Sequence, residues 1–370
     1  RDLFRKSGRP LEREVDLQPL DLVREHRFAD GSVLALPGGS RATQLHAVEA
    51  LGPGLGQQWV EHVASYGPTW ELLRREWYER VWSADVEPRE LRALLSSRRS
   101  LHTHLRKAFG DERLRLVAGH ALLADGHDLR DVPAWAGLHI RLEKRFGTWT
   151  VPGGLAALGS ALSQRLATRG VTVHTGTEVR DVVVRSGRAV AVATDAGEVD
   201  ADVVVVAIDP HRLPALAAHV RKVRSTTPPA ITHLGLEGQW PDLPHEIVLH
   251  GDPLAVVRTT GQAPAGATAW TLHVRGRARR DPLEVLAAHG LAVQGRVTVR
   301  VDHSPESSLQ RWGGSPMGVL WRGARTAHER LGPRTPVPGV LAAGAHSTTG
   351  SGLPFAGLSA ALVAAVVGPA

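Results

Sequence analysis

The chain has 370 residues, of which 42% are hydrophobic and 22% charged, as is typical of a folded protein with one large or two medium domains. It contains no cysteine, which excludes disulfide bonds, thiolate zinc sites and cysteine nucleophiles. The net charge of +7 is compatible with nucleic acid or an anionic membrane as partner. However, Lys is rare while Arg, Ala, Val and Gly are abundant, which indicates a compositional bias. We therefore predict a solvated basic surface, no nucleic-acid partner and a cytoplasmic protein.

Residues 1–41 predict a short helix followed by a β-hairpin. The stretches Arg27–Ala29 and Ser32–Leu36 flank Asp30 and Gly31, a pair typical of a two-residue type I′ turn.

Residues 42–147 predict a series of helices that end at turn-forming pairs. The helix ends are expected at Gly52-Pro53-Gly54, Gly67-Pro68, Glu87-Pro88 and Val132-Pro133. Four tryptophans of this part, Trp59, Trp70, Trp77 and Trp82, are interpreted as core residues rather than as the wall of a ligand pocket.

Residues 147–210 carry the clearest pattern. Val151–Gly154 opens a helix with Leu155, Leu158, Leu162 and Leu166 on one face, and Gly170 ends it. The predicted strands that follow are Val171–Val173, Val182–Val184, Ala189–Val192, Glu198–Val199 and Val203–Ala207. The middle three form a small meander, and the unbroken apolar run of the last is typical of a parallel strand buried on both faces.

The remainder is mixed. Strands are expected near Ile231–Leu236, Ile247–Leu249, Ala255–Val257 and Trp270–Val274. The last 35 residues predict a strand at Val340–Ala343, a glycine-rich loop and a closing helix from about Pro354. The uncharged stretch Ala356–Val367 is too short to span a bilayer and is read as a buried helix.

No autonomous catalytic motif is present. The zinc-protease H-E-x-x-H, the P-loop and the G-x-S-x-G elbow are all missing. His102 and His104 lack a third ligand at metal spacing, so no metal site is predicted. Gly52–Gly56 lacks a preceding strand and is interpreted as a turn between helices rather than a dinucleotide loop.

The loop before the last helix is the candidate site. Gly344, Gly350 and Gly352 would let the backbone approach a ligand, and the helix after Leu353-Pro354 points its positive end into the loop. This arrangement suits the negative charge that develops on a reduced flavin. A purely structural turn with a packing helix fits the spacing equally well.

Several stretches resemble the bacterial phytoene desaturase family of flavoproteins, which is related more distantly to the monoamine oxidases. They are Arg145–Gly154, Thr177–Val179 with Ala207–Pro210, Trp312–Gly318, Val337–Ala345 and Gly350–Pro354. The resemblance runs through nearly all of the chain.

The resemblance implies a mixed α/β chain. Its parts would be an incomplete Rossmann-like FAD-binding domain, of the type with two dinucleotide-binding domains, and a discontinuous helical and β-sheet substrate domain. The expected division is 1–20, 148–215 and 335–370 for the first, and 21–147 and 216–334 for the second. The family's N-terminal G-x-G-x-x-G unit would lie upstream of Arg1, and we expect it to be missing from this chain.

The cofactor implied by the resemblance is FAD. The backbone of Val179 would meet its adenine, Gly344 and Ala345 its pyrophosphate and ribityl chain, and Gly352, Leu353 and Pro354 its isoalloxazine ring. His346–Thr349 departs from the family's T-H-P stretch, and residues 281–308 are shorter than expected. The catalytic base stays unassigned.

The resemblance therefore predicts an oxidoreductase that removes hydride from C–C bonds of a polyene or isoprenoid. The alternatives are an oxidase of an amine or another lipid, and a flavin-free remnant that binds apolar ligands or is inactive. A water-insoluble substrate also suggests peripheral membrane contact. The candidate patch interleaves Arg98, Arg99, Arg106 and Lys107 with Leu94, Leu95, Leu101 and Leu105.

Overall fold

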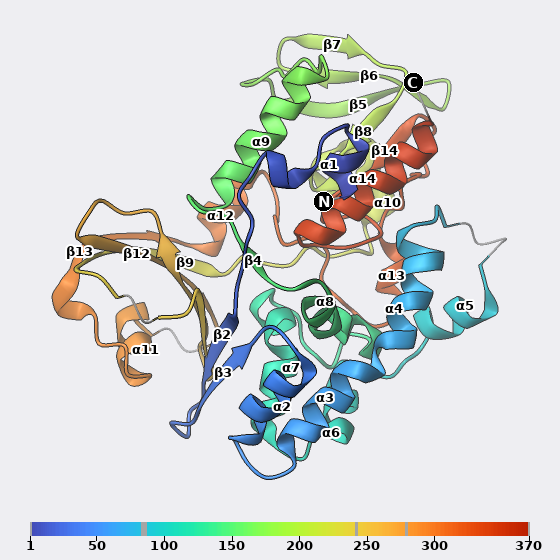
Figure 1. Ribbon diagram of the computed structural model, residues 1–370. Helices are drawn as coiled ribbons and strands as arrows, with labels where there is room; N and C mark the ends of the chain where they lie inside the picture. The colour runs from blue at the N-terminus through green and yellow to red at the C-terminus, as the bar shows by residue number, and fades with distance from the viewer. Residues whose placement is uncertain (1, 83–86, 241–242, 278–279, 369–370) are drawn as a thin grey trace.

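The computed structural model describes residues 2–82, 87–240, 243–277 and 280–368. Figure 1 shows three parts: small sheets with two long helices at the top, a seven-stranded sheet at the left and a group of helices at the lower right. The chain passes repeatedly between these parts, so that strands from residues 22–37 and 230–303 share one sheet. The expected mixed α/β fold is present.

The upper part is built on two small sheets. Its strands are β5 (Val179–Arg185), β6 (Arg188–Thr194), β7 (Gly197–Asp200), β8 (Val204–Val206) and β14 (Val340–Ala342). The antiparallel order β5-β6-β7 confirms the predicted meander, and β8 pairs with β14 in parallel. Its helices and helical turns are α1 (Asp2–Lys6), η1 (Leu11–Arg13), α9 (Leu155–Thr168), η5 (Pro210–Arg212), α10 (Pro214–Val220) and α14 (Leu353–Val367).

Two strand predictions in this part are wrong. β8 is buried on one face only, since Val204 and Val206 are buried whereas Val205 is 47% exposed. A strand is buried on both faces only where packed elements cover both, and β8 has them on one face. The segment expected to form a strand at Val171–Val173 is irregular, because it pairs with no described strand, and both valines are largely exposed.

The seven-stranded sheet has the order β13-β9-β12-β11-β10-β2-β3. Its strands are β2 (Leu22–Arg27), β3 (Val33–Pro37), β9 (Ala230–Glu237), β10 (Glu246–Leu249), β11 (Leu254–Gly261), β12 (Ala267–Arg275) and β13 (Val297–His303). All neighbours are antiparallel except β10 and β2. The four strands expected after residue 230 are confirmed, whereas β13 was not predicted. Short helical elements flank the sheet: α11 (Pro282–Ala288), η6 (Gln294–Arg296) and α12 (Pro305–Trp312).

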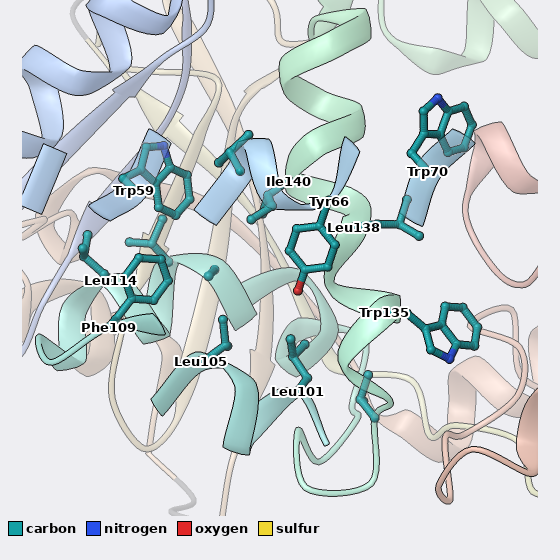
Figure 2. Packing of buried hydrophobic residues seen from close by; sticks show 14 of the residues in the cluster. Trp59, Tyr66, Trp70, Leu101, Leu105, Phe109, Leu114, Trp135, Leu138 and Ile140 are labelled. Carbon is teal, nitrogen blue, oxygen red and sulfur yellow. The ribbon is translucent and has the colours of Figure 1, made fainter. Parts of the chain in front are cut away.

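The helical part contains the largest buried cluster of the described residues (Figure 2). Its elements are α2 (Arg41–Glu49), α3 (Leu55–Ser65), α4 (Gly67–Leu73), the π-helical turn η2 (Arg74–Tyr78), α5 (Arg89–Leu95), α6 (Leu101–Ala108), α7 (Glu112–Ala124), η4 (Ala134–Leu138), α8 (His139–Phe146) and α13 (Thr326–Glu329). Trp59, Trp70 and Trp77 are at most 5% exposed and Trp82 packs against the cluster, which confirms the tryptophans as core residues. The carboxylate of Glu49 accepts hydrogen bonds from the N–H groups of Gly54 and Gly56, so this glycine-rich stretch is a turn between helices, as predicted.

The N-terminal hairpin forms as β2 and β3, but its turn is not type I′. The N–H of Gly31 donates to the carbonyl of Phe28, and the N–H of Phe28 donates to the carbonyl of Ser32. Only Gly31 has a positive φ, of 81°, whereas type I′ needs positive φ at both central residues. The connection is therefore a three-residue loop that ends in a left-handed glycine.

A buried ionic group joins this hairpin to distant elements. Arg24 on β2 donates to both carboxylate oxygens of Glu143 on α8, one at 2.9 Å, and its Nε donates to Glu246 on β10 at 2.8 Å. The Arg24 side chain is only 8% exposed. Because a buried charge needs a partner, these carboxylates fix the packing of the sheet against α8.

The predicted membrane patch is not an apolar surface. Leu95, Leu101 and Leu105 are buried in the helical core, while Arg98 and Arg106 are exposed. The interleaved pattern thus reflects the ordinary amphipathic character of α5 and α6, whose leucines face the core. Only the charged side chains of the patch could contact a bilayer. Among the helices of the described residues, none combines the length and the apolar character needed to cross a bilayer.

Candidate cofactor site

The loop between β14 and α14 folds back over its own helix. The N–H of Gly344 donates to Oγ of Ser359 on α14 at 3.0 Å, and Oγ of Ser347 donates to the carbonyl of Gly344 at 2.8 Å. Thr349 donates through Oγ1 to the carbonyl of Phe355 at 2.7 Å. These three hydrogen bonds stay within the loop or join it to α14. The backbone on the outer side of the loop takes no part in them.

The glycines of this loop are required by its backbone. Gly344, Gly350 and Gly352 have φ values of 87°, 100° and 103°, which side chains strongly disfavour. Gly352, Leu353 and Pro354 are exposed, Leu353 by 61%, so bare backbone and the start of α14 face outward together.

The first turn of α14 adds a favourable field. This helix has 15 residues, and Gly352 at its N-cap supplies no capping side chain. Unsatisfied N–H groups at such an end stabilise a nearby negative charge by about 0.3–1 kcal/mol. The bare loop and this positive end fit the phosphate and isoalloxazine groups of a flavin.

The segment Trp312–Gly318 packs directly against this loop. A β-carbon at Gly318 would overlap the carbonyl oxygen of Ala345, and one at Gly314 would lie 2.6 Å from Cβ of Asp209. The N–H of Thr226 donates to the carbonyl of Gly318 at 2.9 Å. Three of the stretches that carried the resemblance therefore meet at the carboxyl ends of β8 and β14, although they are far apart in sequence: Ala207–Pro210, Trp312–Gly318 and Val337–Ala345.

Asp209 lies at the centre of this junction. It follows β8, and its carboxylate accepts hydrogen bonds from Nδ1 of His211 at 2.8 Å and Oγ of Ser225 at 2.9 Å. Nδ1 of His346 lies 3.8 Å from the same carboxylate. Burial favours a raised pKa for Asp209, but His346, His211 and Ser225 outweigh it and hold the pKa below its ordinary value.

A second charged side chain lies beneath the loop. Nη1 of Arg330 is 2.7 Å from where a β-carbon of Gly350 would be, and the guanidinium stacks on Trp321 with its Cζ 4.4 Å from the ring centre. Burial lowers the pKa of Arg330 to about 10, partly offset by Tyr78. Its Nε is buried and makes no hydrogen bond. A cation therefore borders the loop from the protein side.

Comparisons with known proteins identify the family of the chain. A family model described as flavin-containing amine oxidoreductase matches residues 20–368. The chain belongs to this family. Its membership makes the chain one of a family of flavin-containing oxidoreductases.

Relatives with named activities include carotenoid enzymes. The chain is 28% identical to the neurosporene-forming phytoene desaturase of Cereibacter sphaeroides, over 68% of this chain and 52% of that protein. It is 26% identical to the 4,4'-diapolycopene oxygenase of Methylomonas sp, over 68% of this chain and 53% of that protein. The chain thus spans about half the length of these two relatives. Similarity to the hydroxyneurosporene desaturase of Cereibacter sphaeroides, at 25% identity, covers 97% of the chain and 83% of that protein.

Solved structures with the same fold include amine oxidases. Cyclohexylamine oxidase from Brevibacterium oxydans aligns with a TM-score of 0.63 at 17% identity, over 99% of this chain and 83% of that one. A putrescine oxidase variant aligns with a TM-score of 0.62 at 14% identity, over 99% and 84%. At these identities the similarity shows a shared fold.

In this flavin-containing amine oxidoreductase family member, five of the six residues predicted for the cofactor share one loop. Gly344 and Ala345 begin it, and Gly352–Pro354 end it at α14. Val179 lies elsewhere, as the first residue of β5 in the meander, where it is 40% exposed and pairs with Thr194.

Sequence reasoning did not name Asp209, His346 or Arg330 as site residues. Asp209 lies in the stretch Ala207–Pro210, which indicates only the resemblance, and His346 lies in the stretch His346–Thr349, which departs from the family's pattern. The signal that could have found Asp209 is its position shortly after the predicted parallel strand Val203–Ala207, at the edge of a sheet where ligands bind.

A separate small pocket of about 30 Å³ lies between β2, β3 and the helical part. The polar groups on its walls already have partners: Glu143 pairs with Arg24, and Gln44 bonds to Pro37 and Trp59. Lys144 donates to the carbonyl of Gly39. We therefore assign it no role in the chemistry.

Proposed function

We propose that the chain binds FAD and removes hydride from C–C bonds of a polyene or isoprenoid. The observation that carries the proposal is the convergence of Asp209, the segment Trp312–Gly318 and the glycine loop at one edge of the parallel strands. That edge is where ligands bind in open α/β sheets.

Within this proposal, residues 1–20, 148–215 and 335–370 form the flavin-binding part, and 21–147 and 216–334 form the substrate part. Val179 would contact the adenine through its backbone. Gly344 and Ala345 would lie by the pyrophosphate and ribityl chain, and Gly352, Leu353 and Pro354 by the isoalloxazine ring.

The side chains that border the start of α14 favour an apolar substrate. Phe355 packs against Tyr78, with ring centres 5.6 Å apart, and Leu358 packs against the same helical core. The cation of Arg330 borders Gly350 at the same place. A protonated amine would be repelled there, whereas a neutral polyene would not.

The chemistry divides between the cofactor and the chain. A bound flavin supplies a hydride acceptor at N5. The chain's own groups would hold the ring edge near the positive end of α14, and such a helix end stabilises negative charge by up to about 2 kcal/mol when partly buried. The proton that leaves the substrate passes to a base or to water, and no side chain is assigned as that base.

Anaerobic reduction of the flavin tests the proposal. The full-length protein should lose its visible flavin absorbance when a C40 polyene such as phytoene is added in detergent micelles, and the product should have a longer conjugated chain. Cyclohexylamine and putrescine serve as matched amine probes and should leave the spectrum unchanged. Reduction by an amine alone would favour the amine-oxidase alternative. A full-length protein that takes up no flavin would favour the flavin-free one.

A further inference from the structure

We propose that His346 is a positioning residue: anchored by Asp209, it fixes the Gly344–Ala345 turn and cancels a carboxylate charge at the cofactor edge. This inference rests on the proposed flavin site and assigns a role to two residues, His346 and Asp209. It is carried by the buried contacts of these two side chains.

His346 spans the gap between the loop and two other segments. Its ring is 7% exposed, and Nε2 lies 2.9 Å from the carbonyl oxygen of Ser315. Because a carbonyl only accepts, Nε2 carries a hydrogen and donates it. Nδ1 is buried, makes no hydrogen bond and faces the carboxylate of Asp209 at 3.8 Å.

Asp209 is held rigidly enough to act as an anchor. The hydroxyl of Ser225 and the ring of His211 bind its two oxygens, and the backbone N–H of His211 donates to it at 3.1 Å. Gly314 packs against its Cβ from another side. Movement of Asp209 would therefore break hydrogen bonds to His211 and Ser225 and disturb its packing against Gly314.

The position of His346 and Asp209 lets them orient the loop backbone that would contact a ligand. His346 directly follows Ala345, and the carbonyl of Ala345 is packed against Gly318. The ring of His346 therefore fixes the rotation of the peptide bond that joins Ala345 to His346. The N–H of Ser347 closes the turn on the carbonyl of Gly344 at 3.1 Å. A displaced ring would therefore reorient the backbone that the proposed site offers to the pyrophosphate.

The charge of the His346–Asp209 pair would affect a bound cofactor as much as the geometry of the pair does. A neutral ring would turn a lone pair of Nδ1 toward a carboxylate, whereas a protonated ring donates to Ser315 and attracts Asp209 at the same time. In the protonated form His346 cancels a negative charge at the edge where a phosphate-bearing cofactor would lie. Without it, the carboxylate would repel that cofactor.

A charge-swap cycle in the full-length protein tests both roles. The variants are H346Q, which keeps a donor for Ser315 but has no charge, D209N, and the double variant D209N/H346Q. The exposed His219 on α10, as H219A, is the matched control. Readouts are the dissociation constant of FAD, the flavin reduction potential, and the melting temperature of the flavin-free protein.

We expect H346Q to weaken FAD binding by about tenfold or more, and D209N/H346Q to recover most of that loss, because the second change removes the uncompensated charge. H219A should bind FAD like the wild type. Melting temperatures should not follow this order, since a merely structural role would make the double variant the worst. Wild-type affinity in H346Q, or no recovery in the double variant, would overturn the inference. A wild-type protein that binds no flavin would instead overturn the proposed function on which it rests.

Discussion

Gly318 packs so closely against the carbonyl of Ala345 that no side chain fits between the two segments. Gly318 also has a φ of 74°. Gly318→Ala should therefore push the loop away from the edge of β8 and β14, with a cost of about 1–3 kcal/mol from backbone strain alone. We expect flavin content to fall more than stability does, as measured by absorbance of the purified full-length protein and by thermal melting. Gly323→Ala is the control, because Gly323 has a φ of 86° but no atom within 4 Å of the added carbon. Equal flavin content in both variants would show that this contact does not shape the site.

Gly352 joins the loop to α14 at the exposed edge. Gly352→Val should abolish flavin retention and leave the fold largely intact, because a β-branched residue resists its φ of 103° while the position itself is exposed. Absorbance at flavin wavelengths and far-UV circular dichroism measure the two effects separately. Gly31→Val is the control, because Gly31 also has a positive φ, of 81°, and open space around it, but lies in the β2–β3 hairpin. It should keep its flavin, and normal flavin in Gly352→Val would remove this residue from the cofactor site.

The Arg24 group predicts a specific loss of stability in acid. Burial favours a raised pKa for Glu143, but Arg24 outweighs it and brings the pKa down to about 2. Since this folded value is depressed, the pair stabilises fully above the ordinary pKa of 4.5 and loses that contribution as the pH falls toward 2. Glu143→Gln should cost about 3 kcal/mol at neutral pH and flatten this part of the profile in urea unfolding. Glu79→Gln, which breaks an exposed pair with Arg74, should cost at most about 1 kcal/mol. A similar cost in both variants would contradict a structural role for the buried group.

Buried histidines extend the acid sensitivity to milder pH. Burial, with smaller contributions from His104 and His139, lowers the pKa of His62 to about 3. The folded state therefore binds fewer protons than the unfolded chain, and stability declines as the pH falls from 6.5 toward 3. His62→Phe should remove part of that decline, because the new ring packs against Tyr66 and Phe109 without a buried nitrogen. The exposed His46, as His46→Gln, should leave the slope unchanged. If His62→Phe keeps the wild-type slope, this histidine does not contribute to it.

Short-range sequence patterns correctly predicted the helix ends, the meander and the conformation of the loop glycines, because neighbouring residues determine these features. Glycine and proline pairs marked the ends of the helices, and alternating valines marked the meander β5-β6-β7. The loop glycines were expected to need unusual backbone, and their positive φ values agree. The hairpin was found, but its turn type depends on which backbone hydrogen bonds close around Gly31, and residue identity alone does not set that.

Contacts between distant segments lay beyond the sequence. The one-sided burial of β8 depends on what packs against it, not on its run of valines. β13 has only exposed or half-exposed residues, so its alternation gave no sign of a buried face. His346 and Asp209 meet only because β8 and β14 pair in parallel, which brings the residues that follow both strands to one edge.

The order of strands in the seven-stranded sheet also determines how long β2 lacks one of its partner strands while the chain is synthesised. β2 and β3 are made first, yet β10, the strand that pairs with β2, begins only at Glu246. A ribosome that adds ~5–20 residues per second needs about 10–40 s for the roughly 200 residues between them. During that interval the edge of β2 has no partner from β10, while β3 already has α2 beside it. Chaperone demand in the cell should therefore concentrate on the nascent hairpin, and slowing translation after Pro37 should raise the aggregated fraction.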